Sequence, residues 1–163
     1  MGENHQTCDT NEIELICNYT YQTLLFQEAS RWKSYEEIPA DALEHTIEAS
    51  IQKLLERLEK KHGKKFVSRS LAYITAAHRG LSQSELEDIL SLDEEVLGGL
   101  FTHWVPPVRR VPPSLWPRLY HDIRAFLVER DADDVSVLSW YHSHFVNAAR
   151  QRYLSDRVDF VQV

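Results

Sequence analysis

Residues 135–154 pass from a strand-like run directly into an amphipathic helix, and this junction constrains the fold more than any other segment. Residues 135–140 alternate in type and are rich in β-branched and aromatic side chains, which is typical of a strand. An acidic turn at residues 131–134 separates them from a second apolar run at 126–129, so the two runs predict a β-hairpin. Beyond the hairpin, apolar side chains recur at helical spacing. His142 is therefore expected where the second strand ends and the helix begins.

Helical patterns occupy most of the chain before the hairpin. The clearest start is a capping box, in which Ser82 accepts from the backbone of Glu85 and the Glu85 carboxylate reaches back to the backbone of Ser82. Four prolines within residues 105–113 exclude a regular helix there and predict an extended, exposed connector. The expected helices run over residues 13 to 30 or 32, 43–62, 66–78, 83–90, 93–100 and 115–126.

Composition limits the classes of function. The chain has 163 residues, of which 43% are hydrophobic, enough for about one domain with a buried core. Its formal charge of −7 argues against affinity for nucleic acid or anionic membrane, because both need clustered Lys and Arg. The two cysteines, Cys8 and Cys17, form neither a disulfide framework nor a zinc motif. No signal peptide or membrane span is recognised. We expect a cytoplasmic protein without nucleic-acid or membrane partners.

The motifs of nucleotide-binding and hydrolytic enzymes are missing from this sequence. Glycine occurs only at positions 2, 63, 80, 98 and 99, so the chain has no phosphate loop, dinucleotide-binding turn or nucleophile elbow. We predict no enzyme activity and no cofactor for this chain alone. His142 and His144 are two residues apart, but a zinc site needs two further ligands, so no metal site is predicted. From the residues alone, His142 is a junction histidine satisfied by backbone groups.

Two charged stretches are candidate contact surfaces. Arg109 and Arg110 lie between two Pro-Pro pairs and could bind an acidic partner or a phosphate. Two adjacent arginines are, however, usually solvated surface. The acidic run of residues 88–95 is interpreted as a solvated helix face. Residues 83–96 contain six acids and no Lys or Arg, which disfavours a DNA-reading helix because phosphate would repel it.

The order of elements is that of a winged-helix domain preceded by a helical segment. Residues 54–63 (LLERLEKKHG), 79–86 (RGLSQSEL), 140–145 (WYHSHF) and 152–154 (RYL) resemble the region after the ATPase core in NACHT and WD-repeat proteins, members of the STAND class of P-loop NTPases. Residues 24–32 (LLFQEASRW) are similar to the small helical domain of that family. The resemblance spans about residues 15–155 and rests on the order and spacing of these segments together.

This resemblance implies a mainly α fold. Residues 1–10 would be a flexible tail, 11–64 a helical domain, 65–155 a winged-helix domain with a small β-hairpin wing, and 156–163 the start of a linker. In the family, the phosphate loop and the magnesium-binding acid lie N-terminal to this region and a WD-repeat propeller lies C-terminal. ADP or ATP would therefore be held only by that separate ATPase core.

The resemblance also gives His142 a role. The family's winged helix commonly offers one histidine to bound ADP in a pattern like F-x-H-x-x-F, which is matched at His142 and Phe145 with Trp140 as the first aromatic. His144 is the alternative. The implied function is a regulatory signalling module that closes over ADP and couples nucleotide state to oligomeric assembly. Its partners would be the NACHT core and propeller of the same protein, with further protein partners or copies. The competing function is a DNA-binding winged helix.

Overall fold

We analysed a computed structural model of the chain, which describes residues 10–30, 32, 33, 35, 43–101, 106–132 and 135–154. The chain divides into two compact units, residues 1–54 and 55–163. The domain boundary predicted after residue 64 stays a prediction.

The first unit holds α1 (Thr10–Ala29) and the beginning of α2 (Ile47–His62). The Tyr21 hydroxyl donates to the backbone oxygen of Glu44 at 2.7 Å, which links the segment before α2 to α1. The predicted start of the second helix at Leu43 is wrong by several residues. The Thr46 hydroxyl accepts from the backbone N–H of Ala49 at 3.2 Å, as an N-cap residue does, and α2 begins immediately after it.

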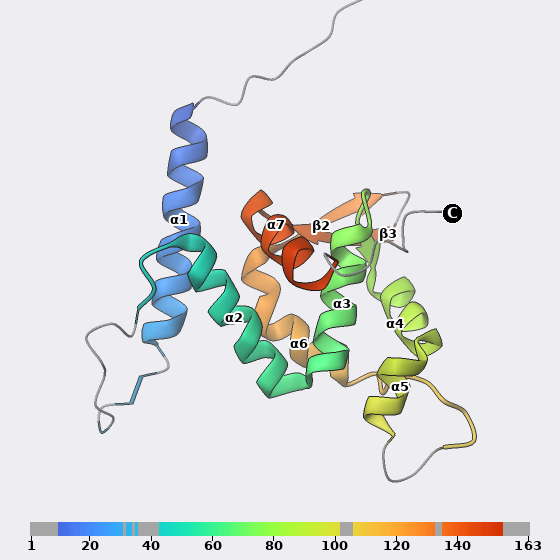
Figure 1. The fold of residues 1–163 in the computed structure, drawn as a ribbon. Helices are drawn as coiled ribbons and strands as arrows, with labels where there is room; N and C mark the ends of the chain where they lie inside the picture. Colours follow the sequence, from blue (N-terminus) through green and yellow to red (C-terminus); the bar gives the residue numbers. More distant parts are fainter. Residues whose placement is uncertain are drawn as a thin grey trace, which may run out of the picture. The chain divides into compact units, whose positions relative to one another are not determined.

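The second unit confirms the predicted order of elements (Figure 1). After α2, the chain forms α3 (Lys64–Ala76), β1 (Leu81–Ser82), α4 (Gln83–Leu92), α5 (Glu94–Leu100), α6 (Leu115–Ile123), the 3₁₀ turn η1 (Arg124–Phe126), β2 (Leu127–Ala132), β3 (Val135–Trp140) and α7 (Ser143–Tyr153). The fold is mainly α with a small three-stranded antiparallel sheet, as a winged-helix domain requires.

The sheet has the strand order β1-β3-β2. The predicted hairpin is confirmed, with Leu127 opposite Trp140 and Glu129 opposite Leu138. The third strand, β1, was not predicted. It is only two residues long, and Gly80 before it has φ of +87°, with Leu138 O only 3.0 Å from where a Cβ would stand. Glycine is thus needed both for the backbone conformation and for the close approach to β3.

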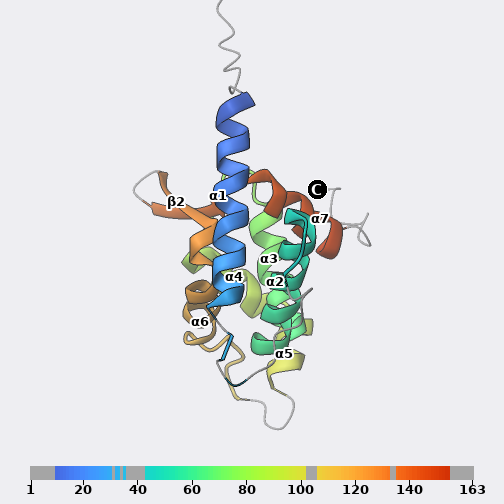
Figure 2. The same cartoon turned by 90° about the vertical axis from the view of Figure 1, so that its left-hand side faces the viewer.

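Helix α3 is the central element of the second unit. Figure 1 shows it between α7 on one side and the α4–α5 pair on the other, and it also contacts β3. In Figure 2, β2 and α7 project to opposite sides of this arrangement. The largest fully buried side chains of the unit are Trp116, Phe126, Phe145, Leu55, Leu58, Leu71, Leu86, Leu90, Leu119, Ile123 and Val67. They come from nearly every helix, so a single core holds the unit together.

Ion pairs tie the end of α2 to α6 and α7. Glu59 Oε1 accepts from Arg152 Nε and from the Tyr153 hydroxyl, each at 2.8 Å, although the Glu59 side chain is only 9% exposed. Burial alone would raise the pKa of Glu59, but these hydrogen bonds outweigh it and hold the pKa below its usual value. Despite burial, the pKa of Asp122 is also held below its usual value, because its Oδ2 lies 2.6 Å from Lys61 Nζ and 2.7 Å from His62 Nε2.

The proline-rich connector contains neither helix nor strand in its described part, residues 106–113, as predicted. Its predicted exposure is right for most positions but wrong for Val111, which is 6% exposed. The backbone N–H of Val111 donates to Ser91 Oγ at 3.1 Å. One residue of the connector is therefore anchored on α4 while its neighbours stay at the surface.

The capping box at the start of α4 is confirmed. Ser82 Oγ accepts from the Glu85 N–H at 3.3 Å, and Glu85 Oε2 accepts from the Ser82 N–H at 2.9 Å. We predict that Ser82→Ala lowers the free energy of unfolding by about 0.5–2 kcal/mol, because the buried start of α4 loses its cap. Chemical denaturation of the 163-residue chain measures this. Gln83→Ala, at an exposed neighbouring position, should change it by less than about 0.5 kcal/mol. Equal effects at both positions would contradict the capping role.

Candidate functional site

The predicted site lies where β3 turns into α7, and aromatic packing fixes this turn. Phe145 is 1% exposed, and its ring centroid lies 4.7 Å from that of Phe126 and 5.5 Å from that of Trp140. Trp140 Nε1 donates to Thr75 Oγ1 of α3 at 2.9 Å, so the last residue of β3 is held from two sides. His142 lies in the sequence between Trp140 and Phe145, whose rings are both held by this packing.

His142 is the N-cap residue of α7. Its backbone is extended, with φ −135° and ψ 147°, and its Nδ1 accepts from the backbone N–H of His144 at 3.3 Å. In a neutral imidazole one nitrogen accepts and the other carries the proton, so this cap assigns the proton to Nε2. Burial, and then the nearby His144, lower the pKa of His142 below its usual value. The lowered pKa favours the neutral form of the half-buried ring, in which Nε2–H is the donor.

The structure brings the two candidate sensor residues together. The rings of His142 and His144 stack with centroids 4.8 Å apart and planes 12° from parallel. Both side chains are half-buried. The His142 ring additionally caps the helix, through its Nδ1.

The predicted contact arginines lie on different elements from the histidines. Arg109 Nη2 is 2.9 Å from Glu94 Oε2, and Arg110 forms an ion pair with Asp88. The side chain of Arg109 is 38% exposed and that of Arg110 is 65% exposed. Each arginine therefore stays at the surface but already has a carboxylate partner on α4 or α5.

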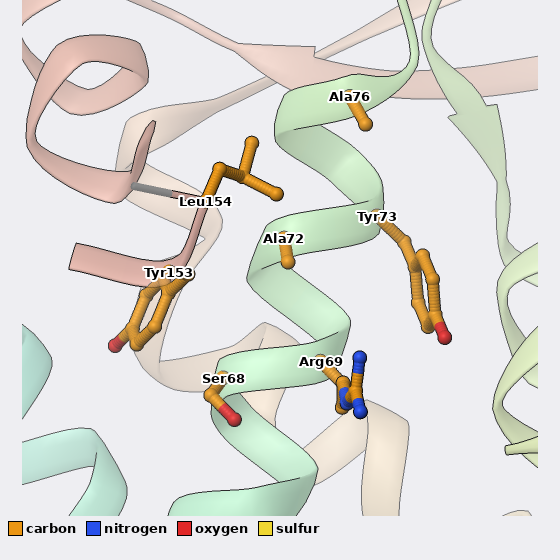
Figure 3. A pocket seen from close by; sticks show the side chains of 7 residues that line it. All are labelled: Ser68, Arg69, Ala72, Tyr73, Ala76, Tyr153 and Leu154. Carbon is orange, nitrogen blue, oxygen red and sulfur yellow. The ribbon is translucent and has the colours of Figure 1, made fainter. Parts of the chain in front are cut away.

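A recess that the sequence did not reveal lies between α3 and the C-terminal end of α7 (Figure 3). Its volume is about 140 Å³. The residues that line it include Arg69, Ala72, Tyr73, Ala76, Tyr153 and Leu154. Most of this lining is apolar, and Figure 3 shows Tyr153 and Leu154 on the α7 side of it.

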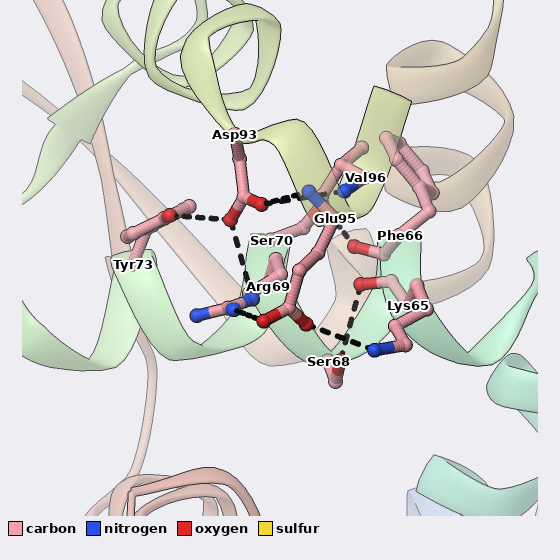
Figure 4. Close-up of polar contacts among 9 residues, drawn as sticks. All are labelled: Lys65, Phe66, Ser68, Arg69, Ser70, Tyr73, Asp93, Glu95 and Val96. Carbon is pink, nitrogen blue, oxygen red and sulfur yellow. Dashed lines mark hydrogen bonds and ion pairs between the residues drawn. The ribbon is translucent and has the colours of Figure 1, made fainter. Parts of the chain in front are cut away.

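Beside the recess, the interpretation of residues 88–95 as a solvated face is wrong for Asp93, whose side chain is only 8% exposed (Figure 4). Its Oδ2 lies 3.2 Å from Arg69 Nε and accepts from the Tyr73 hydroxyl at 2.8 Å, while its Oδ1 caps α5. Burial and the bond to Asp93 raise the pKa of Tyr73 to about 12. An Asp before a helix is a recognisable cap signal, but its partners on α3 follow only from the tertiary fold.

Glu95 extends this cluster toward the surface. Its two carboxylate oxygens pair with Arg69 Nη2 at 2.9 Å and with Lys65 Nζ at 2.8 Å. The hydrogen bonds from Lys65 and Arg69 lower the pKa of Glu95 below its usual value. The N-terminal half of α3 is thus fastened to α5 by charge.

Within the described parts of the chain, no group of three or more His, Cys, Asp or Glu side chains is arranged to hold a metal ion. Of the helices that the structure describes, none has both the length and the apolar character needed to cross a membrane.

The sequence of this chain is similar to known proteins. Residues 33–161 match a family model described as the NWD1-like winged helix-turn-helix domain. The chain is 41% identical over 135 residues to the human NACHT domain- and WD repeat-containing protein 1, and 39% identical over 141 residues to the human NACHT and WD repeat domain-containing protein 2. The mouse form of the first is 40% identical over 135 residues. No solved structure matches the chain.

These alignments cover most of this chain but little of the relatives. They include 81% and 85% of the chain for the two human proteins, and the chain spans 8% of the length of each. What is similar is thus one region of much longer proteins.

The cap geometry predicts how stability depends on pH. Because the pKa of His142 is lower in the folded chain than in the unfolded chain, the unfolded chain binds more protons as the pH falls below the usual value of 6.5. Stability should therefore decrease from neutral pH toward pH 5, where a proton on Nδ1 would also remove the cap. His142→Asn keeps a side-chain acceptor for the cap but has no titrating ring. Chemical denaturation at neutral pH and at pH 5 should therefore show a smaller decrease in the free energy of unfolding for this variant than for the wild type.

The matched control is His121→Asn on exposed helix surface, which should leave the pH dependence of the wild type unchanged. An NMR titration of the His142 ring gives the pKa directly. A value at or above 6.5 would contradict the cap assignment.

Proposed function

Because this chain belongs to the NWD1-like winged helix-turn-helix family, we propose that it is the regulatory region of a longer NACHT and WD-repeat protein and that it closes over ADP held by a separate ATPase core. In this proposal the chain binds and signals but performs no catalysis. Its primary partners are the core and the propeller of the same polypeptide, in the cytoplasm, and its opening permits oligomeric assembly.

The orientation of the His142 ring carries the proposal. A residue that senses a phosphate must present a donor whose direction is fixed before the ligand arrives. His142 meets this requirement, since the cap to the His144 N–H uses Nδ1 and leaves the proton on Nε2. The packing of Phe145 on Trp140 and Phe126 then holds the backbone on both sides of the turn. The geometry thus supports a preorganised donor at this turn.

The size of the effect suits a regulatory switch. A hydrogen bond from a side chain to a charged phosphate is worth about 1.5–3 kcal/mol. Since about 1.4 kcal/mol changes an equilibrium constant tenfold, one such bond can shift a closed-to-open equilibrium by about tenfold or more. Binding of the ADP phosphate would favour the closed form, and loss of that contact would favour the open, assembling form.

Arg109 and Arg110 supply a second contact surface in this proposal. Both form exposed ion pairs with α4 or α5, and such pairs contribute little stability and exchange readily with other carboxylates or phosphates. We propose that they contact an acidic partner surface when the module docks.

The test is made in the full-length protein that carries this chain. His142→Ala should release ADP about tenfold faster than wild type, because the closed form loses its phosphate contact. A fluorescent ADP analogue displaced by excess ADP measures the rate, and gel filtration measures the assembled fraction, which should rise. His121→Ala, on exposed helix surface, is the control and should behave as wild type.

The outcomes separate the two histidines. If His144→Ala accelerates ADP release and His142→Ala does not, the sensor is His144. If neither variant changes it, His142 is a structural junction residue and the sensing role is wrong. Micromolar binding of a random DNA duplex by the 163-residue chain at low salt would favour the competing DNA-binding function over the regulatory one.

A further inference from the structure

The apolar recess between α3 and α7 opens beside a larger charged cavity of about 490 Å³. The two cavities share Ser68, Arg69 and Tyr153, so we treat them as one groove, here called the α3–α7 groove. All of its lining residues belong to the second unit of the chain. Together they make a concave surface of the size that ligands use, with an apolar end and a charged end.

The apolar end has room for one side chain. A cavity of about 150 Å³ lined by apolar groups can hold a benzene ring, and the recess, at about 140 Å³, is of that size. Its walls include the methyl groups of Ala72 and Ala76, the side chain of Leu154 and the ring of Tyr153. An aromatic or branched aliphatic side chain would therefore fit in the recess.

The charged end favours a single negative charge. Its lining contains Lys64, Lys65, Arg69 and Arg152 but only two carboxylates, those of Glu59 and Glu95. Asp93 and Glu56, which pair with the same arginines, bring the whole cluster close to neutrality. The lining therefore has more positive than negative groups, although the larger cluster is close to neutral. Such a local excess suits one carboxylate better than a polyanion.

Lys64 is the cation best placed to provide that charge. The other three cations at this end are engaged, since Lys65 and Arg69 pair with Glu95 and Arg152 pairs with Glu59. Among the described residues, the Lys64 ammonium has no carboxylate at ion-pair distance, although its charge helps to lower the pKa of Glu59. A carboxylate entering the groove could pair with Lys64 without displacing an existing partner.

We propose that the α3–α7 groove binds a peptide segment of a partner protein in which an aromatic or branched aliphatic side chain is followed by Asp or Glu. The apolar side chain occupies the recess and the carboxylate pairs with Lys64 at the charged end. This site requires neither nucleotide nor an ATPase core, so it stands apart from the function proposed above.

Capped tripeptides test the site on the isotope-labelled 163-residue chain by NMR titration. The probe, alanyl-phenylalanyl-glutamate, should give saturable shifts at the backbone amides of Ala72, Ala76 and Leu154. Replacing its glutamate by glutamine should weaken binding several-fold, and replacing its phenylalanine by alanine should weaken it at least tenfold. Ala76→Leu narrows the recess from an exposed position and should weaken binding of the probe about tenfold while leaving the fold unchanged.

The charge contact has its own matched pair of variants. Lys64→Glu should weaken the glutamate peptide several-fold but leave the glutamine peptide unaffected, whereas Lys60→Glu, on exposed α2 surface, should affect neither. The proposal is overturned if no saturable shift occurs at the groove up to about 10 mM peptide, a range that would detect even very weak binding. It is also overturned if 3-phenylpropionate binds as tightly as the probe, because the groove would then select a small free acid rather than a peptide segment.

Discussion

The second unit depends on the packing of one buried ring, that of Phe145. This ring contacts Phe126, which precedes the hairpin, and Trp140, which ends it. Aromatic pairs of this kind contribute about 0.5–1.5 kcal/mol beyond the area that they bury. Because Trp140 also donates to Thr75, the same packing joins the hairpin, α7 and α3. This packing positions the backbone at the turn, and the cap to the His144 N–H then orients the His142 ring.

Two sets of ion pairs join the helices around α3. Lys65 and Arg69 of α3 bind a carboxylate of α5, while Arg152 and Tyr153 of α7 bind Glu59 near the end of α2. Desolvation offsets much of the attraction in such part-buried pairs, so they add less to stability than the apolar core does. These ion pairs instead orient the helices, because a buried carboxylate with two or three donors accepts only one arrangement of the helices around it. The α3–α7 groove lies between these two sets of ion pairs.

The sequence predicted the elements whose cause is local. The capping box of Ser82 and Glu85, the β-hairpin and the proline-rich connector each depend on neighbouring residues, and each is present in the described part of the structure. The acidic turn predicted at residues 131–134 is wrong at its start, because Asp131 and Ala132 belong to β2, and residues 133 and 134 lie outside the described residues. The sequence did not predict β1, because two residues carry no periodicity and the pairing with β3 requires the positive φ of Gly80. Nor did it predict the burial of Asp93, whose partners Arg69 and Tyr73 are distant in sequence and meet it only through the packing of α3 on α5.

The choice between His142 and His144 shows the same limit at the site itself. Two histidines two residues apart are equivalent in the sequence, and the structure places their rings in contact. It distinguishes them by the N-cap, which assigns an acceptor to His142 Nδ1 and therefore a donor to Nε2. The contact also affects charge, because the nearby His144 helps to lower the pKa of His142. In the proposed sensing role, the N-cap would fix the direction of the His142 hydrogen bond to a phosphate, and the stacked His144 ring would disfavour a positive charge on His142.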